Sequence, residues 1–162
     1  MRRTMAGRIL GIAAAVAGFA ATEAKAADFV WPVSGTCTSS YWTWRGGYYH
    51  KAIDIAAPYW RAVGASRWGY VRYRGWNGGY GRLVIVGHAS GYSTYYAHNI
   101  AYGRSGSVGR LTTISYVGST GWSTGPHCHF EIRRWGGKIY VPARYGSWIS
   151  KGGSIWYNYA GI

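Results

Sequence analysis

The chain has 162 residues and a formal net charge of +14, with 18 lysines and arginines against four acidic residues. This length suits one domain with its own core, and the lack of internal repeats excludes a repeat array. A chain this basic favours a polyanionic neighbour, for which anionic cell-wall polymers, lipid head groups and extracellular nucleic acid are candidates, although high charge also serves solubility alone.

Residues 1–26, MRRTMAGRILGIAAAVAGFAATEAKA, predict a secretory signal peptide. Arginines open the segment, an apolar run follows from residue 9 to residue 21, and Ala24 and Ala26 form a small-x-small cleavage site. The run is too short for a stable membrane span, and no second run of membrane length follows. We expect one mature domain, residues 27–162, which is secreted or held in the periplasm or cell envelope as a monomer with a net charge of +11.

The segment GGYYHKAIDIAAP, residues 46–58, places His50 and Asp54 four residues apart. Both side chains then point to the same side, whether the segment is a strand or a helix. The isoleucines on either side of Asp54 favour a strand and place its carboxylate where water is scarce. A charged group in such a place requires a partner, either an arginine or a metal ion.

Short segments bounded by glycine follow, and several alternate as strands do. In GYSTYYAHN, residues 91–99, alternation places His98 on the same face as Tyr96 and opposite Tyr95 and Ala97. We therefore expect an all-β protein, an antiparallel sandwich or partly open barrel. The expected strands lie in residues 69–76, 81–89, 91–99, 111–118, 128–135 and 138–143.

The segment GPHCHFEI, residues 125–132, holds two histidines on either side of a cysteine. In a strand, His127, His129 and Glu131 share one face, while Cys128 points to the other. One metal ion could therefore bind the histidines but not the cysteine.

A histidine and an aspartate from residues 46–58, with a histidine from residues 125–132, make up the ligand set of a catalytic zinc ion. Two nitrogens and one carboxylate leave the fourth tetrahedral position to water. The HExxH motif of helical zinc proteases is absent, so that arrangement is excluded. A further strand histidine, His98, strengthens the hypothesis of a zinc-dependent reaction.

Three motifs together resemble the lysostaphin-type (LytM-like) zinc endopeptidases, which cut peptide cross-links in bacterial peptidoglycan. HKAID resembles their HxGxD element, GGYGRLVIVGHASGYSTYYAH their central strands ending in Tyr-Ala-His, and GSTGWSTGPHCHFEIR their loop and HxH strand. The similarity runs from about Gly35 to about Pro142, with motif order and spacing in agreement. It implies the lysostaphin-type peptidase fold and hydrolysis of peptidoglycan cross-links or stem peptides.

The resemblance also implies the role of each site residue. One zinc ion would be held by His50, Asp54 and His129, while His98 and His127 would act on the reaction. These two would orient or deprotonate the zinc-bound water and pass the proton to the leaving amine, and the sequence leaves open which takes it first. Expected partners are peptidoglycan peptides and, by charge, anionic cell-wall polymers, with no nucleic acid.

Three further residues lie near these motifs. Glu131 either fixes the ring of a ligand histidine or is a surface carboxylate that balances Arg133 or Arg134. Tyr48 shares the face of His50 and is a candidate donor to the oxyanion of the tetrahedral intermediate. His88 lies at a turn without a partner in sequence, so we expect it to be structural or solvent-facing.

Cys37 and Cys128 are the only cysteines. An even cysteine count in an exported chain favours a disulfide between them. The alternative is a buried thiol at position 128, where the family more often has leucine.

Some connecting segments depart from the family pattern. Trp60 and Ala62 stand in place of a Gly-x-Pro turn, Arg67 in place of an acidic turn residue, and Leu111 where glycine is commoner. These departures affect loop shapes and groove walls more than the chemistry.

Two other function classes stay open. A non-catalytic relative that binds the cell wall or regulates amidases would keep the fold but lack one or more ligands, and all five site residues stand in this chain. An extracellular nucleic-acid binder would combine the basic groups with tyrosine and tryptophan stacking. Zinc analysis of the purified protein separates these classes.

Overall fold

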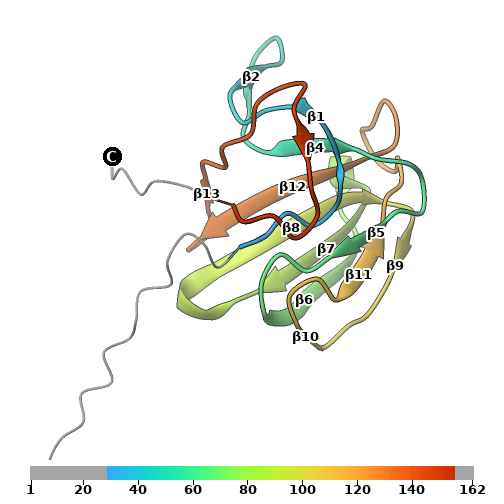
Figure 1. Ribbon diagram of the computed structural model, residues 1–162, viewed down its shortest axis with the longest axis vertical. Coiled ribbons are helices and arrows are strands. Elements are labelled where there is room, and N and C mark those ends of the chain that lie inside the picture. The colour runs from blue at the N-terminus through green and yellow to red at the C-terminus, as the bar shows by residue number, and fades with distance from the viewer. Residues whose placement is uncertain (1–28, 156–162) are drawn as a thin grey trace, which may run out of the picture.

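Residues 29–155 form an almost entirely β structure in the computed structural model (Figure 1). Helical segments within these residues are two 3₁₀ turns, η2 (Gly78–Tyr80) and η3 (Ala89–Gly91), and none is long and apolar enough to cross a membrane. The expected all-β, antiparallel fold is therefore confirmed. The expected signal peptide, residues 1–26, lies outside the described residues.

One large antiparallel sheet forms the body of the molecule, with β12 (His127–Arg134) near its middle. Its other strands are β1 (Gly35–Ser39), β4 (Ile53–Ala56), β6 (Gly69–Trp76), β7 (Arg82–Gly87), β8 (Tyr92–Asn99), β10 (Ser107–Val108), β13 (Gly137–Ile139) and β14 (Trp148–Ile149). The order is β10–β6–β7–β8–β12–β4–β1–β14, and β13 also pairs with β12. The strand that carries Asp54, β4, is thus the direct neighbour of the strand that carries His127 and His129, β12.

Two smaller sheets complete the fold. One has the order β5–β11–β9, and the other is the hairpin β2–β3. These strands are β2 (Thr43–Trp44), β3 (Tyr49–His50), β5 (Ala62–Gly64), β9 (Ala101–Tyr102) and β11 (Thr113–Tyr116).

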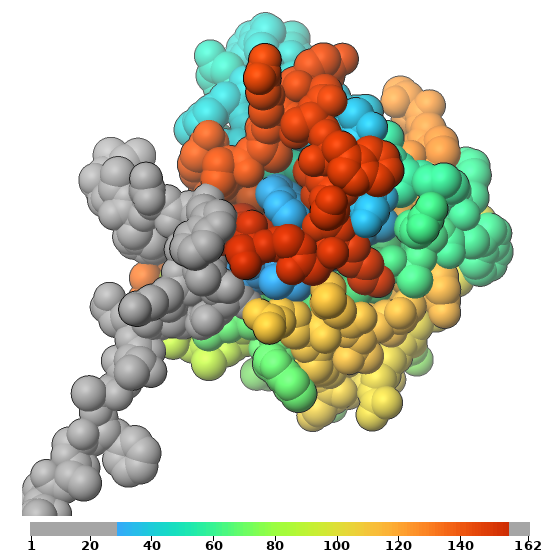
Figure 2. Space-filling model, viewed as in Figure 1, coloured from blue at the N-terminus to red at the C-terminus, as the bar shows by residue number. Residues whose placement is uncertain are grey.

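The chain after β13 returns across β1. Figure 2 shows this red segment lying over the blue residues of β1. Hydrogen bonds of 2.8 and 2.9 Å join Cys37 to Gly146 and Ser147 there. The segment also buries Val141 and Ile149, so it closes the core on this side.

The hydrophobic core lies against one face of the large sheet, because alternate residues of each strand point there. Phe130 and Ile132 of β12 and Ile53 and Ile55 of β4 are fully buried in it. The Phe130 ring packs 5.5 Å from the ring of Tyr96 on β8. Removal of such a side chain costs about 3–5 kcal/mol, so these residues anchor the strands that carry the site.

The expected disulfide is wrong, since Cys37 and Cys128 are both free and buried. β1 and β12 lie on opposite sides of β4, and each cysteine is the cross-strand partner of Ile55. Two strand spacings separate the backbones by roughly 9–10 Å, whereas a disulfide joins Cα atoms about 4.4–6.8 Å apart. Burial raises the pKa of both thiols, and Cys128 packs as a small apolar residue.

Two departures from the family pattern lie at turns with left-handed backbone. Trp60 has φ of 67° and Leu111 has φ of 66°. This conformation costs an L-residue roughly 1–2 kcal/mol, whereas glycine adopts it freely. The left-handed backbone thus explains why the family pattern favours glycine at these turns.

His88 ends a chain of hydrogen bonds on the core side of the sheet, so its expected structural role is correct. The Ser66 N–H donates to Tyr96 Oη at 2.7 Å, and Tyr96 and Thr94 hydroxyls lie 2.8 Å apart. Thr94 Oγ1 is 2.8 Å from His88 Nε2, and His88 Nδ1 donates to the Trp68 carbonyl at 2.8 Å. Every hydrogen-bond donor in this series has an acceptor only when His88 is neutral, because Nε2 must then accept from the Thr94 hydroxyl.

We expect His88 to make the fold sensitive to acid. Burial lowers its pKa to about 4, against 6.5 for an unperturbed histidine. As the pH falls, the unfolded chain takes up this proton near pH 6.5 and the folded chain only near pH 4. The contribution of neutral His88 to the free energy of unfolding is therefore complete above pH 6.5 and is lost between pH 6.5 and pH 4. The loss amounts to roughly 3 kcal/mol.

Urea unfolding at several pH values tests this expectation by comparing the wild type with His88→Gln. The amide of the variant does not titrate, so its free energy of unfolding should fall less steeply between pH 6.5 and pH 4. Equal slopes for the two proteins would contradict the assignment to His88.

The described surface lacks side-chain carboxylates. Asp54 and Glu131 are the only acidic residues between positions 29 and 155, and they are 5% and 1% exposed. The same residues include 14 lysines and arginines. Side-chain carboxylates of residues 29–155 therefore contribute almost nothing to the exposed surface, and basic side chains outnumber them in this part of the chain.

Candidate metal centre

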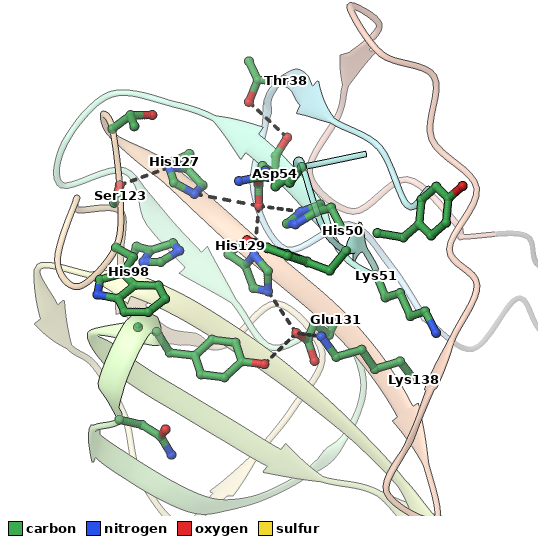
Figure 3. Close-up of a pocket in the computed structure, with 18 residues that line it drawn as sticks. Thr38, His50, Lys51, Asp54, His98, Ser123, His127, His129, Glu131 and Lys138 are labelled. Atoms are coloured by element: carbon green, nitrogen blue, oxygen red, sulfur yellow. Dashed lines mark hydrogen bonds and ion pairs between the residues drawn. The ribbon is translucent and has the colours of Figure 1, made fainter. Parts of the chain in front are cut away.

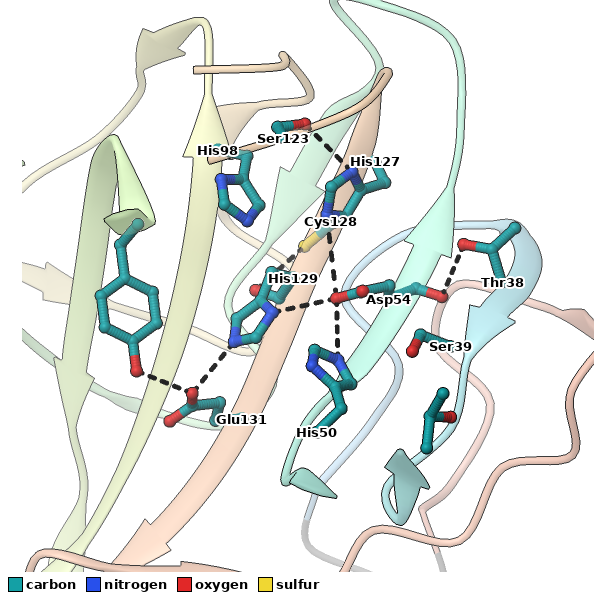
Figure 4. A network of polar contacts seen from close by, with 12 residues as sticks. Thr38, Ser39, His50, Asp54, His98, Ser123, His127, Cys128, His129 and Glu131 are labelled. Carbon is teal, nitrogen blue, oxygen red and sulfur yellow. Dashed lines mark hydrogen bonds and ion pairs between the residues drawn. The ribbon is translucent and has the colours of Figure 1, made fainter. Parts of the chain in front are cut away.

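Neighbouring strands bring the three ligand candidates together. Ile53 and Ile55 enter the core, so Asp54 between them points to the opposite face of β4. β12 pairs with β4 in the register that sets His129 beside Asp54. His50 ends β3 just before β4 and approaches the same carboxylate (Figure 4).

Asp54 Oδ1 is the atom on which the cluster converges. It lies 3.1 Å from His50 Nε2 and 2.9 Å from His129 Nδ1. One candidate ligand atom from each residue lies within 4.8 Å of the others, and all three residues are buried. The His50 Nε2 approach lacks hydrogen-bond geometry, so this buried nitrogen has no hydrogen-bond partner among the described residues.

These residues fit a zinc ion. A buried polar atom without a partner is rare in folded proteins, and a metal ion would satisfy His50 Nε2. Two imidazoles and one carboxylate are a common three-residue zinc set. The donor chemistry and the convergence of the side chains therefore agree with the ligand set expected from the family.

The second oxygen of Asp54 faces an arginine. Arg45, in the turn of the β2–β3 hairpin, donates from Nη2 to Asp54 Oδ2 at 2.6 Å and to Ser39 Oγ at 2.9 Å. Burial alone would raise the pKa of Asp54, but His129 and His50 outweigh it and hold that pKa well below its usual range. The arginine partner that the sequence left open for Asp54 is thus present at Oδ2, while Oδ1 faces the two histidines.

His98 and His127 lie beside this cluster with their ring centroids 4.6 Å apart. His98 Nδ1 donates to the Thr120 carbonyl at 2.7 Å, and His127 Nδ1 donates to the Gly125 carbonyl at 2.8 Å. A carbonyl only accepts, so each Nδ1 carries the hydrogen and each neutral ring keeps a lone pair on Nε2. Burial lowers the pKa of His98 to about 4, which favours that neutral form.

His98 reaches the site through a break in strand alternation. Simple alternation places it on the face of Tyr96, which is buried in the core, and that expectation is wrong. His98 has φ of 61°, next to a register shift between β7 and β8. The left-handed residue turns its ring to the other face, 5.6 Å from the ring of His129.

Glu131 lies on the same face of β12, one alternation beyond His129. It is 1% exposed and accepts a hydrogen bond from His129 Nε2 at 2.9 Å. Arg133 also pairs with it, at 2.6 Å. Contact with a ligand histidine, the first interpretation left open by the sequence, therefore describes Glu131. The alternative of a surface carboxylate is wrong because Glu131 is buried, although it does pair with Arg133.

A cavity of about 510 Å³ opens over the cluster (Figure 3). All five expected site residues line it, and so does Tyr48, whose side chain is 60% exposed. Sequence reasoning missed Arg45, Tyr80 and Lys138, which also line it. Short-range spacing carried no signal for these three, since the fold brings them in from separate segments.

A second cavity of about 530 Å³ adjoins the first at His127. Its other lining residues are small or uncharged: Thr38, Ala56, Ala57, Pro58, Thr124, Gly125 and Pro126. The ends of the combined cleft therefore differ in character, because Lys51 and Lys138 line the first cavity (Figure 3).

The family model of peptidase family M23 matches residues 48–142, which include all five site residues. The chain belongs to peptidase family M23. The resemblance to lysostaphin-type peptidases is thereby confirmed.

Relatives of this M23 chain include an enzyme and an activator. It is 47% identical over 92 residues to the DD-carboxypeptidase/endopeptidase Mpg of Neisseria meningitidis, covering 56% of the chain and 21% of Mpg. It is 36% identical over 128 residues to the murein hydrolase activator NlpD of Escherichia coli, covering 76% of the chain and 32% of NlpD. The chain thus spans about a fifth to a third of the length of these curated relatives.

A solved structure shares the fold. A zinc-containing peptidase from Vibrio cholerae matches this M23 chain with a TM-score of 0.61 and 27% identity, over 67% of this chain and 37% of that one.

Proposed function

We propose that this M23 domain is a zinc-dependent endopeptidase that hydrolyses peptides of bacterial peptidoglycan. The observation that carries the proposal is the convergence of His50, Asp54 and His129 on one point, with His50 Nε2 buried and without a hydrogen-bond partner. These residues would hold one zinc ion, with the open cavity beside them for water and substrate.

In the proposed mechanism the histidines beside the ligands move the protons. A bound zinc ion would supply a water of lowered pKa and would polarise the scissile carbonyl. In their neutral forms His98 and His127 each keep a lone pair on Nε2, because each Nδ1 donates to a backbone carbonyl. One of them takes the proton from the attacking water, and protonation of the leaving amine completes hydrolysis.

For the substrate, we propose a peptide with a small uncharged residue on one side of the scissile bond and a free carboxylate on the other. Alanine, proline and glycine line the cavity next to His127, which suits a small residue. Lys51 lines the other cavity and forms no ion pair among residues 29–155, so it is available to a carboxylate. These features favour a D-alanyl bond to a diamino acid over an uncharged glycine bridge, in line with the similarity to the DD-carboxypeptidase/endopeptidase Mpg.

Digestion of defined muropeptides tests both proposals. Cross-linked dimers with a D-alanyl bond to diaminopimelate should yield one new amino terminus, measured by mass spectrometry, and should be cut faster than pentaglycine-bridged dimers. Sugar fragments without a new amino terminus would overturn the peptidase proposal. Faster cleavage of the glycine bridge would overturn only the choice of substrate.

The second candidate function is activation of a murein hydrolase, which the match to NlpD over 76% of the chain favours. An activator would act through its surface and would not need a complete metal site. We infer that hydrolysis is the main activity because the expected site residues are all present and all line one cavity. Activation of a purified amidase by Asp54→Ala at the wild-type level, with no peptidase activity in the wild type, would favour the activator instead.

Location and partners follow from the same proposal. We infer that the domain acts in the cell envelope as a monomer, with peptidoglycan peptides as substrate and anionic cell-wall polymers as a second, electrostatic partner. The cationic surface without exposed side-chain carboxylates supports the second partner.

A further inference from the structure

Glu131 is the one acidic side chain between positions 29 and 155 that lies outside the proposed ligand set, and four side chains contact it. Its Oε1 atom lies 2.9 Å from His129 Nε2, 2.9 Å from the Tyr80 hydroxyl and 2.7 Å from Lys138 Nζ. Its Oε2 atom accepts from Arg133 Nε at 2.7 Å. A fully buried carboxylate is costly, and these donors keep it charged in place.

Contacts around Glu131 define the orientation of the His129 ring. An ionised carboxylate only accepts hydrogen bonds, so the hydrogen in the contact with Glu131 belongs to His129 Nε2. The other nitrogen, Nδ1, faces Asp54 Oδ1, the atom on which the cluster converges. Asp54 Oδ1 also only accepts, so Nδ1 carries the hydrogen in the contact with Asp54, and a bound metal ion would replace that hydrogen while Glu131 keeps the hydrogen on Nε2.

We propose that Glu131 is a positioning residue that holds His129 with Nε2–H outward and Nδ1 toward the metal position. The inference rests on the proposed zinc site, but assigns a task to a residue outside the ligand set. Tyr80, Arg133 and Lys138 in turn fix Glu131, since each contacts its oxygens. A hydrogen bond of this kind orients a ligand imidazole and makes it a better donor to metal.

Two of the three ligand candidates, Asp54 and His129, have a hydrogen-bond partner outside the ligand set, and His50 Nε2 has none among residues 29–155. Arg45 holds the second oxygen of Asp54, much as Glu131 holds the second nitrogen of His129. His50 Nε2 has no hydrogen-bond partner, so its ring position depends on packing, for example 5.1 Å from the His129 ring. The orientation of His129 therefore affects both of the other ligand candidates.

Zinc affinity of Glu131→Gln tests the proposal, measured on the purified chain by competition with a chromogenic chelator. The neutral amide keeps the size of the side chain but loses its charge, so zinc should bind about 10–100-fold more weakly. The visible spectrum of the cobalt-substituted protein should change as well, because it reports ligand geometry. His88→Gln is the control: His88 lies outside the cavity and does not contact Glu131, so zinc affinity should stay unchanged.

Outcomes separate this proposal from the proposed function. A wild-type chain that binds no zinc would remove the proposed function itself. A wild type that binds zinc, with the same affinity and cobalt spectrum in a folded Glu131→Gln, would overturn the positioning role alone.

A substitution that does not contact His129 keeps the test decisive if Glu131→Gln fails to fold. Lys138→Met removes a partner of Glu131 at the partly exposed edge of the cavity, where the side chain of Lys138 is 31% exposed. Its zinc affinity should fall severalfold, to a value between the affinity of the wild type and that of Glu131→Gln. Unchanged affinity and cobalt spectrum in this variant would overturn the proposal.

Discussion

Asp54→Ala is expected to reduce zinc content from one ion per chain to nearly none. Its Oδ1 atom is the point shared by His50 and His129, so the substitution removes a ligand and the centre of the cluster. It also leaves Arg45 without its carboxylate partner, which places an uncompensated positive charge beside the empty position. Elemental analysis after dialysis against buffer with trace zinc measures the effect.

The fold should survive Asp54→Ala, because the core lies on the opposite face of β4, where Ile53 and Ile55 stay buried. Circular dichroism checks this. His88→Gln is the matched control, since it changes a histidine outside the site and should retain full zinc. Unchanged zinc content in folded Asp54→Ala would show that Asp54 is not a ligand.

His127→Ala is expected to keep nearly full zinc occupancy and to lose about 10²–10⁴ in kcat. His127 Nε2 lies 3.8 Å from Asp54 Oδ1, near the cluster but farther than either proposed ligand nitrogen. Loss of a group that moves a proton in the transition state lowers kcat without emptying the metal site. His98→Ala should behave in the same way, and steady-state kinetics on a defined muropeptide measure both.

His129→Ala provides the opposite pattern, with loss of zinc as well as activity. If His127→Ala strips the metal while His129→Ala retains it, the two roles are reversed. Equal activity of His127→Ala and wild type at full zinc occupancy would remove His127 from the mechanism.

The main features of the fold could be predicted because the sequence signals were local. Alternation in GPHCHFEI correctly separates Cys128, which is in the core, from His127, His129 and Glu131, which line the cavity. Glycine-bounded segments likewise predicted an antiparallel β protein. The expected approach of His50 and Asp54 is also found, but they lie on two successive strands, β3 and β4, and not on one element as the spacing argument assumed.

Other features depended on tertiary structure. The wrong disulfide arose because sequence cannot show that β4 lies between the two cysteine-bearing strands. The orientation of His98 required a left-handed residue at a register shift, which alternation cannot predict. Arg45 and Lys138 reach their carboxylates from a hairpin turn and an outer strand, so only the fold reveals these contacts.

The described surface carries no side-chain carboxylate, so we expect binding to a polyanion to depend on salt and hydrolysis to depend on pH. Eleven of its 14 basic residues are arginines, which stay charged at every pH a cell envelope meets. A fall in pH therefore leaves the attraction of these arginines to a polyanion almost unchanged. Salt does the reverse, since the screening length falls from about 10 Å at 0.1 M to about 3 Å at 1 M. We therefore expect high salt to weaken binding to an anionic polymer, and acid to lower hydrolytic activity without releasing the domain from the polymer.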